Sequence, residues 1–273
     1  MSALDAKQRR RGERAELLDI ALTAAQEAAA IIRARASEVR SIEWRKKGPS
    51  DFVSDVDMSA EHAIRAVLAR EAPEAVVLGE EMSPTAAVDA GVAFVVDPLD
   101  GTTNFLHGYP EYAVSIGALL GGRLAAGVVL NVPLGDIFTA TLGGGAHRNG
   151  ERLSVSTIAD PSLALIGTGF PFRDLHQIDR YLRQFAAVTR GTAGLRRAGS
   201  AALDLADVAA GRFDGFWELR LSPWDFAAGT LLVREASGLV TDLAGDDVPF
   251  VPSSVVAGNP AMHAWLLHTL NEP

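Results

Sequence analysis

The stretch Asp97-Pro98-Leu99-Asp100-Gly101-Thr102-Thr103-Asn104-Phe105 decides the fold, because it follows directly on a short, fully apolar run at residues 92–96. Such a run predicts a buried β-strand. A second apolar run, at residues 75–78, is likewise followed by an acidic residue, Glu80. Acidic side chains are therefore expected at the ends of two strands, where sheet proteins commonly build their sites.

The residues around this stretch predict helices and strands in mixed order, and hence an α/β fold. Helical patterns cover residues 15–39, 58–70, 175–189, 201–210, 226–236 and 261–270, and strand patterns cover 112–120, 124–131, 136–141, 164–168, 213–218, 239–242 and 255–257. The first three of these strands are joined by short turns, which predicts an antiparallel meander, and Asn149-Gly150 predicts a further hairpin. A soft boundary near residues 151–161 divides an N-terminal α+β part, 1–155, from a C-terminal α/β part, 156–273.

The composition excludes several classes of protein. The 273 residues include no cysteine, which excludes thiolate zinc sites, iron–sulfur clusters and cysteine nucleophiles. No apolar stretch approaches the roughly 18 residues of a membrane-spanning helix, and the charged N-terminus is no secretory signal, so a cytoplasmic protein is expected. The net charge of -9 argues against nucleic acid as a partner. Only the first fourteen residues are basic, and we interpret them as a frayed, solvated arm.

Asp97 and Asp100 carry the densest chemical signal. Two carboxylates three residues apart, which leave a strand and enter a Gly-Thr-Thr turn, can converge on one point. Oxygen ligands of this kind suit a hard divalent ion such as Mg²⁺, and the backbone N–H groups that follow suit a phosphate. The alternative is an ordinary Asp-Gly turn with a capping Asp, which the length of the whole nine-residue string disfavours.

Three other acidic residues have two interpretations each. Glu80, in Gly79-Glu80-Glu81, is either a site residue or part of a solvated loop. Asp225 follows Ser222-Pro223-Trp224 at the start of an apolar helix, so it either caps that helix or faces an interior cleft where a cation must compensate its charge. Asp57 is either a site residue or the N-terminal cap of the helix at residues 58–70. The residues alone leave these alternatives open.

Six strings of residues together resemble the inositol monophosphatase family. They are residues 47–57 (KGPSDFVSDVD), 79–81 (GEE), 97–105 (DPLDGTTNF), 169–173 (GFPFR), 199–206 (GSAALDLA) and 224–225 (WD). These strings extend over nearly the whole chain, and the similarity is greatest to the bacterial inositol-1-monophosphatase branch. The resemblance implies a layered α-β-α-β-α sandwich of the sugar-phosphatase type, a homodimer, and Mg²⁺-dependent, lithium-sensitive hydrolysis of a small phosphate monoester, with myo-inositol 1-phosphate as the expected substrate.

The resemblance also implies roles for particular residues in one compact catalytic unit. A first metal ion would be bound by Glu80, Asp97 and the carbonyl of Leu99, and a second by Asp97, Asp100 and Asp225, with two or three Mg²⁺ ions per site. Thr102, hydrogen-bonded to Asp57, would position and help deprotonate the attacking water, with Glu80 close by. Substrate contacts would come from Asp100, Gly101, Thr102, Gly199, Ser200, Ala201 and Glu218. Most metal ligands thus lie in the N-terminal part, and the C-terminal part completes the site.

Two alternatives to an inositol phosphatase stay open. An enzyme of the same fold could act on histidinol phosphate, fructose 1,6-bisphosphate or a nucleotide 3′-phosphate, with Arg173, Arg196 and Arg197 as candidates for recognising the additional charge. The second alternative is a non-catalytic binding protein, since some bacterial relatives are thought to contact the transcription machinery. Such a protein would be expected to have lost a metal-binding carboxylate, and none is lost in this sequence.

Overall fold

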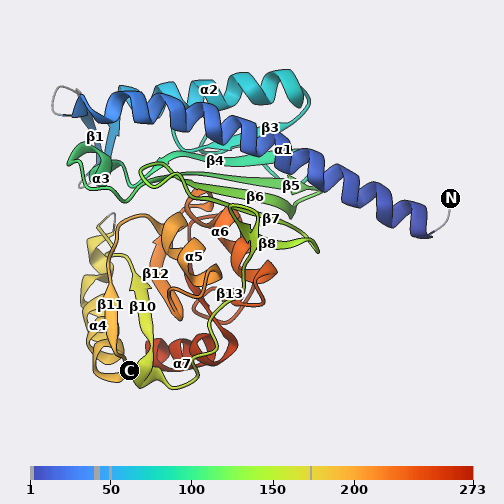
Figure 1. Cartoon of the computed structure of the whole chain (residues 1–273). Coiled ribbons are helices and arrows are strands. Elements are labelled where there is room, and N and C mark those ends of the chain that lie inside the picture. Colours follow the sequence, from blue (N-terminus) through green and yellow to red (C-terminus); the bar gives the residue numbers. More distant parts are fainter. Residues whose placement is uncertain (1–2, 40–43, 49–50, 173, 273) are drawn as a thin grey trace.

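The computed structural model describes residues 3–39, 44–48, 51–172 and 174–272. In this part of the chain, the two larger of three β-sheets alternate with three layers of helices (Figure 1). The layered α-β-α-β-α sandwich expected from the sequence is therefore confirmed. Residues 49–50 of the first motif, and Arg173, lie outside the described residues.

The first sheet has seven strands in the order β3-β4-β5-β6-β7-β8-β9. Their bounds are Val76–Gly79, Val92–Asp100, Ala113–Leu120, Arg123–Asn131, Ile137–Thr141, Gly145–Arg148 and Glu151–Arg152. Strands β3 and β4 run parallel, and the other neighbours run antiparallel, which confirms the meander. The hairpin at Asn149-Gly150 is also confirmed. Its two residues have φ angles of 51° and 85°, as a tight turn of this kind requires.

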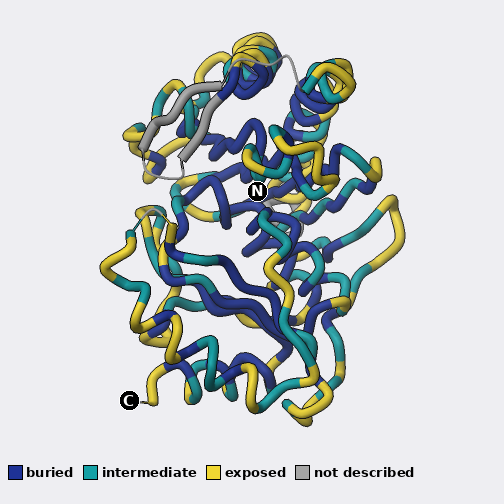
Figure 2. The backbone as a smooth tube through the Cα atoms, turned by 90° about the vertical axis from the view of Figure 1, so that its left-hand side faces the viewer, coloured by how far each residue is buried: buried dark blue, intermediate teal, exposed yellow. Residues whose placement is uncertain are grey.

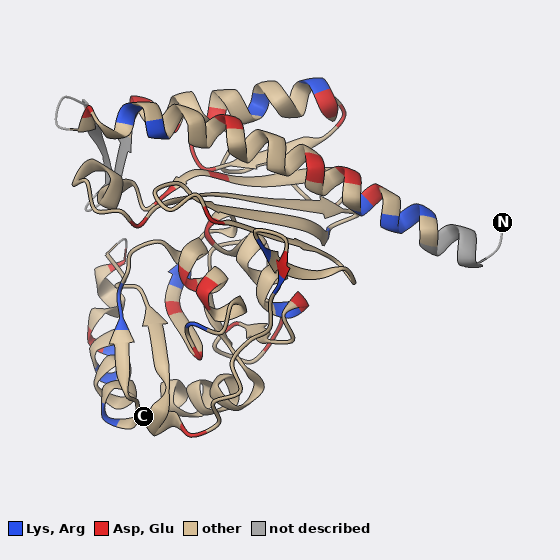
Figure 3. Ribbon diagram, viewed as in Figure 1, with Lys and Arg blue, Asp and Glu red and all other residues tan. Residues whose placement is uncertain are grey.

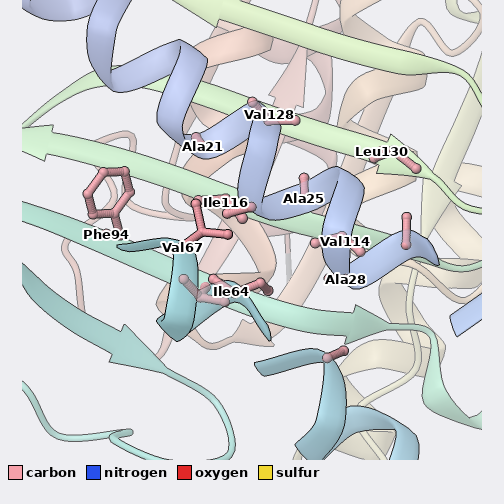
Figure 4. Close-up of a cluster of buried hydrophobic side chains, with 14 of the residues drawn as sticks. Ala21, Ala25, Ala28, Ile64, Val67, Phe94, Val114, Ile116, Val128 and Leu130 are labelled. Carbon is pink, nitrogen blue, oxygen red and sulfur yellow. The ribbon is translucent and has the colours of Figure 1, made fainter. Parts of the chain in front are cut away.

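Helices α1 (Ala3–Ala36) and α2 (Asp55–Glu71) cover the outer face of this sheet (Figure 1). The buried face of α1 consists largely of alanines, which allow the helix backbone to approach strands β5 and β6 closely. Figure 4 shows this core, in which Ala21, Ala25 and Ala28 meet side chains of the strands and of α2. A hairpin of β1 (Trp44–Gly48) and β2 (Asp51–Ser54), which the sequence analysis did not predict, lies between the two helices in the chain.

The N-terminal residues were interpreted as a frayed, solvated arm. The structure describes them as helical from Ala3, so the frayed part of that interpretation is wrong, whereas the exposure of residues 8–12 agrees with a solvated arm. Helix α1 begins at Ala3 and extends beyond the sheet (Figure 1). Arg, Gln and Glu are good helix formers, and no helix breaker other than Gly12 interrupts the segment. Its exposed arginines, Arg9, Arg10 and Arg11, lie on this protruding end (Figure 3). No helix in the described part of the chain is long and apolar enough to cross a membrane.

The second sheet has five strands in the order β11-β10-β12-β14-β13. Their bounds are Gly194–Arg196, Leu165–Thr168, Gly215–Leu221, Ser253–Gly258 and Leu239–Thr241. Helices α5 (Ala201–Ala209) and α6 (Pro223–Glu235) lie between the two sheets, and α4 (Ile178–Gly191) and α7 (Pro260–Asn271) cover the far face. Short 3₁₀ turns at Pro161–Leu163 and Leu175–Gln177 complete the described elements, together with α3 (Thr102–Leu106). Strand β11 (GLR) and helix α3 (TTNFL) were not predicted, since neither contains an apolar run or a periodic pattern.

Helix α6 packs against the first sheet at two glycines. A Cβ atom on Gly117 of β5 would lie 2.9 Å from the Cβ of Ala227, and one on Gly127 of β6 would lie 3.2 Å from the Cα of Ala228. The helix therefore lies as close to the sheet as its backbone allows. Ala227 and Ala228 are fully buried, and the contact fixes the position of the helix start, where Asp225 lies. Figure 2 shows how the buried residues, in dark blue, run through the interior of the molecule.

Candidate active site

A cleft of about 410 Å³ is lined by residues from both halves of the chain. The first half contributes Glu80, Asp97 and residues 99–103, and the second contributes residues 168–172, Asp174, Arg197, Gly199, Ser200, Ala201, Asp204, Glu218, Arg220, Leu221 and Asp225. Every site residue predicted from the sequence lines this cleft except Asp57. The structure therefore brings together side chains that are up to 145 positions apart in the sequence, from Glu80 to Asp225.

A β-bulge directs Asp97 and Asp100 to the same cleft. Strand β4 continues to Asp100 rather than ending at residue 96, and its pairing with β5 slips between these two aspartates. Asp97 is opposite Ser115, whereas Asp100 is opposite Ala113, so three steps on β4 match two on β5. In a regular strand, residues three apart point to opposite faces, and the additional residue of a bulge reverses that relation.

Carboxylate oxygens of Asp97, Asp100 and Asp225 lie within 4.8 Å of one another. Asp97 is 1% exposed, and its burial, followed by the negative charges of Glu80, Asp100 and Asp225, raises its pKa well above the ordinary value. Like charges this close are tolerated only with protonation or with a cation between them. An all-oxygen, acidic set of donors fits a hard divalent ion such as Mg²⁺.

Helix N-termini orient two of these carboxylates. Asp225 is the third residue of α6, and its Oδ2 accepts a 2.7 Å hydrogen bond from the backbone N–H of Ser222. Asp100 Oδ2 accepts hydrogen bonds from Ser200 Oγ (2.6 Å) and from the N–H of Ala202 (2.7 Å), at the start of α5. Both interpretations of Asp225 are therefore correct, because it belongs to a helix cap and also lines the cleft.

Thr102 and Asp57 are hydrogen-bonded, as the family resemblance implies. Thr102 Oγ1 lies 2.9 Å from Asp57 Oδ1 and 3.0 Å from the carbonyl oxygen of Leu99. Ser54 is the N-cap residue of α2, and Asp57, the third residue of the helix, completes its capping box. Asp57 therefore belongs to the helix cap and also bonds to Thr102. Its Oδ2 accepts hydrogen bonds from Ser54 N (2.8 Å) and Oγ (2.6 Å). Burial raises the pKa of this carboxyl group.

Glu80 lines the cleft at the end of β3, outside the group of three carboxylates with oxygens within 4.8 Å. Its backbone N–H donates a 3.2 Å hydrogen bond to the carbonyl of Val96, the residue before Asp97. The charge of Glu80 contributes to the raised pKa of both Asp97 and Asp57. The turn after β3 therefore places Glu80 beside both the metal-binding candidates and the Thr102–Asp57 pair.

Glu218 lies on the side of the cleft formed by β10, α5 and β12. It is within β12 rather than at its end, because the strand continues to Leu221. Its carboxyl group packs against Gly169, where a Cβ atom would overlap it, which explains the glycine in the GFPFR string. Asp204 of α5 lines the same side and was not predicted as a site residue. It is 2% exposed, and its Oδ1 has no hydrogen-bond partner among the residues that the structure describes.

Of the three arginines considered from the sequence, Arg197 lines the cleft. Its guanidinium carbon lies 5.4 Å and 5.2 Å from the ring centroids of Phe170 and Phe172. Arg196 is exposed, donates to the carbonyl of Leu195, and does not line the cleft. Within the described residues, Arg220 is the other basic residue of this cleft, 3.8 Å from Asp174, and the sequence analysis did not identify it.

Comparisons with known proteins identify the family of this chain. The model of the inositol monophosphatase family matches residues 13–272. "Nus factor SuhB" of Pseudomonas aeruginosa is 46% identical, over 93% of this chain and 95% of that protein. "Inositol-1-monophosphatase" of Rhizobium meliloti is 42% identical, over 95% and 98% of the two chains. A crystal structure of the extragenic suppressor protein SuhB from Bartonella henselae has a TM-score of 0.89 at 41% identity, with 94% and 98% coverage. The chain therefore belongs to the inositol monophosphatase family of phosphatases.

Proposed function

We propose that this phosphatase hydrolyses myo-inositol 1-phosphate and related polyol phosphates, and that the reaction depends on Mg²⁺. The observation that carries the proposal is the convergence, in one cleft, of the Asp97, Asp100 and Asp225 carboxylates with the hydroxyl of Thr102. Further support comes from the carboxyl group of Glu218, which lines the same cleft from the second sheet.

The metal ions would be held by Glu80, Asp97, the carbonyl of Leu99, Asp100 and Asp225. When bound, Mg²⁺ supplies Lewis acidity and neutralises charge on the phosphate ester. The phosphate would accept hydrogen bonds from the N–H groups of Gly101 and Thr102 at the start of α3, which have no partner within that helix.

Thr102 and Asp57 would position the attacking water. The Thr102 hydroxyl donates its proton to Asp57, so its oxygen lone pairs can accept a hydrogen bond from a water molecule in the cleft. Asp57 does not line the cleft and is held by Ser54 on its other oxygen, so it orients the hydroxyl without contacting the substrate. A positioned base of this kind contributes roughly 10²–10⁴-fold to the rate. Attack of the water on phosphorus breaks the bond to the ester oxygen and releases the alcohol and inorganic phosphate.

Substrate choice is expected to depend on Glu218. A site that hydrogen-bonds to hydroxyl groups rejects analogues without them, because its polar groups are then left unpaired. Glu218→Gln should therefore reduce kcat/KM for inositol 1-phosphate on the order of tenfold or more, and leave p-nitrophenyl phosphate nearly unaffected. Steady-state kinetics on both substrates measure this ratio. An equal loss on both would show that Glu218 acts on the metal site or the fold.

Lithium is expected to inhibit the enzyme at millimolar concentrations. This expectation follows from the family resemblance and from the compact set of carboxylates. Li⁺ would occupy one of the metal-binding positions that these carboxylates form. A titration with LiCl at fixed Mg²⁺, with NaCl as the control for ionic strength, tests this expectation. A rate that LiCl and NaCl affect equally would contradict it.

A phosphate-release panel tests the proposed function itself. Inositol 1-phosphate should be the best substrate, ahead of histidinol phosphate, fructose 1,6-bisphosphate and adenosine 3′,5′-bisphosphate, and activity should require Mg²⁺. A preference for a bisphosphate would favour the alternative substrate class, for which Arg197 and Arg220 at the cleft are the candidate contacts.

We also propose a homodimer, which analytical ultracentrifugation would test. A non-catalytic role is not favoured, since all the predicted carboxylates line the cleft except Asp57, which bonds to Thr102.

A further inference from the structure

Glu61, on the buried face of α2, connects the helix that carries Asp57 to the turn that carries Glu80. It is 0% exposed, and charged side chains are almost never fully buried without partners. Its Oε1 accepts a 2.9 Å hydrogen bond from Arg65 Nε, and its Oε2 accepts one of 2.8 Å from the backbone N–H of Glu81. The proposed reaction does not use this carboxylate.

The turn at residues 79–83 contains Glu80, directly after Gly79. Gly79 and Ser83 form an antiparallel bridge at its base, with backbone hydrogen bonds of 3.3 and 3.2 Å. The guanidinium of Arg65 also bonds to Ser83 Oγ, so the Glu61–Arg65 pair contacts both sides of the turn. The ion pair therefore ties the turn to α2 directly beside Glu80.

The glycine at position 79 makes room for this contact. A Cβ atom on Gly79 would overlap the carboxyl group of Glu61, so any other residue would push the carboxylate away from the turn. Asp57 and Glu61 are four residues apart, and hence lie on one face of α2. Asp57 holds the hydroxyl of Thr102, and Glu61 holds the N–H that follows Glu80. One rigid helix thus sets the spacing between the two groups.

We propose that Glu61 is a positioning residue for Glu80, which fixes the Glu80 carboxylate relative to Asp97 and Thr102. The inference rests on the metal-binding role proposed for Glu80. Groups that orient metal ligands through hydrogen bonds typically change metal affinity 10–100-fold when they are replaced. Without the buried carboxylate, the N–H of Glu81 loses its acceptor and Arg65 loses its ion-pair partner, so the middle of the turn is no longer bonded to α2 beside Glu80.

A double-mutant cycle on metal binding tests this inference. Calorimetric titration of the purified full chain with Mg²⁺ or Mn²⁺ would compare Glu61→Gln, Glu80→Gln and the double variant. Glutamine at position 61 can accept one of the two hydrogen bonds but not both, because its NH₂ group must face the other donor. In the protein that retains Glu80, Glu61→Gln should weaken metal binding about 10–100-fold. In the Glu80→Gln background, the same substitution should weaken metal binding about twofold or less. Equal losses in both backgrounds, or no loss in the parent, would overturn the inference.

Two further variants control for stability. Gly79→Ala leaves Glu61 in the sequence but displaces its carboxylate, so it should cause the same loss of metal affinity. If the Glu61→Gln protein does not fold, Gly79→Ala takes its place in the cycle. Glu71→Gln, which removes an exposed ion pair with Arg70 on the same helix, should leave affinity unchanged. The titration contains no substrate. If the effects of the Glu61 and Glu80 substitutions on metal affinity are coupled but the enzyme does not hydrolyse inositol 1-phosphate, only the proposed function is overturned. If the enzyme hydrolyses inositol 1-phosphate but the two effects on metal affinity are independent, only the role of Glu61 is overturned.

Discussion

Asp97→Asn is expected to lower phosphate release from inositol 1-phosphate on the order of 10³-fold, or more. Asp97 is the most buried member of the three-carboxylate cluster, and its neighbours Glu80, Asp100 and Asp225 share the cleft. An amide in its place keeps the shape of the side chain but removes a negative charge that the proposed metal ions would require. Initial-rate kinetics over a wide range of Mg²⁺ measure the loss. Activity near that of the parent would contradict the metal assignment.

The same substitution should stabilise the protein when divalent ions are absent. The pKa of Asp97 is raised in the folded state, so the folded protein binds more protons than the unfolded chain above the ordinary carboxylate pKa. The free energy of unfolding of the ion-free protein therefore falls as the pH rises through that range. Asn removes this contribution, and Tm should rise by about 2–4 °C per kcal/mol of repulsion relieved. Calorimetry in EDTA between pH 5 and 8 measures it, with Asp19→Asn on the exposed face of α1 as the control.

Thr102→Val should lower kcat about 10²–10⁴-fold with little change in KM. Valine has nearly the shape of threonine but no hydroxyl, so the water loses its positioning group and Asp57 loses one of its hydrogen-bond partners. Thr102→Ser restores the hydroxyl and should recover most of the rate. Thr103→Val, the next residue along the same cleft, is the matched control and should have a much smaller effect.

Steady-state kinetics of these variants separate the two roles that a hydroxyl can have. If kcat fell by the same factor in Thr102→Val and Thr102→Ser, the side chain would matter for its packing and not for its hydroxyl oxygen. If KM rose while kcat stayed constant, Thr102 would bind substrate without positioning the water. Either result would remove Thr102 and Asp57 from the proposed mechanism.

Long periodic segments and the resemblance to the family predicted much of the fold. The meander and the central helices follow from apolar periodicity, which persists over enough residues to be recognised. Strand β11 is Gly-Leu-Arg, with one large apolar side chain, and α3 is Thr-Thr-Asn-Phe-Leu, a little over one turn, so neither has the apolar run or the periodicity on which the other predictions depend. Helix α1 was predicted too short, because charged residues were interpreted as disorder when their helix propensity extends the helix to Ala3.

At the site, the motifs identified the side chains that line the cleft but not what holds them there. The bulge between Asp97 and Asp100 depends on pairing with β5, which the local sequence does not show. The buried Glu61 looks like an ordinary residue of an amphipathic helix until its contact with the turn at residues 79–83 is seen. Asp204 could have been noticed, because it is one of two carboxylates, with Asp207, in an otherwise apolar helix, and it lies four residues after Ser200.

The contact of α6 with Gly117 and Gly127 restricts how this family member can change during evolution. Protein interiors usually accept enlarged side chains if neighbours shrink to conserve volume. Here the neighbours are Ala227 and Ala228 of the helix that begins beside Asp225, and they have almost no volume left to give up. A methyl group added to either glycine would shift the helix and its aspartate. Selection for catalysis thus extends into the hydrophobic core, at positions that never contact substrate.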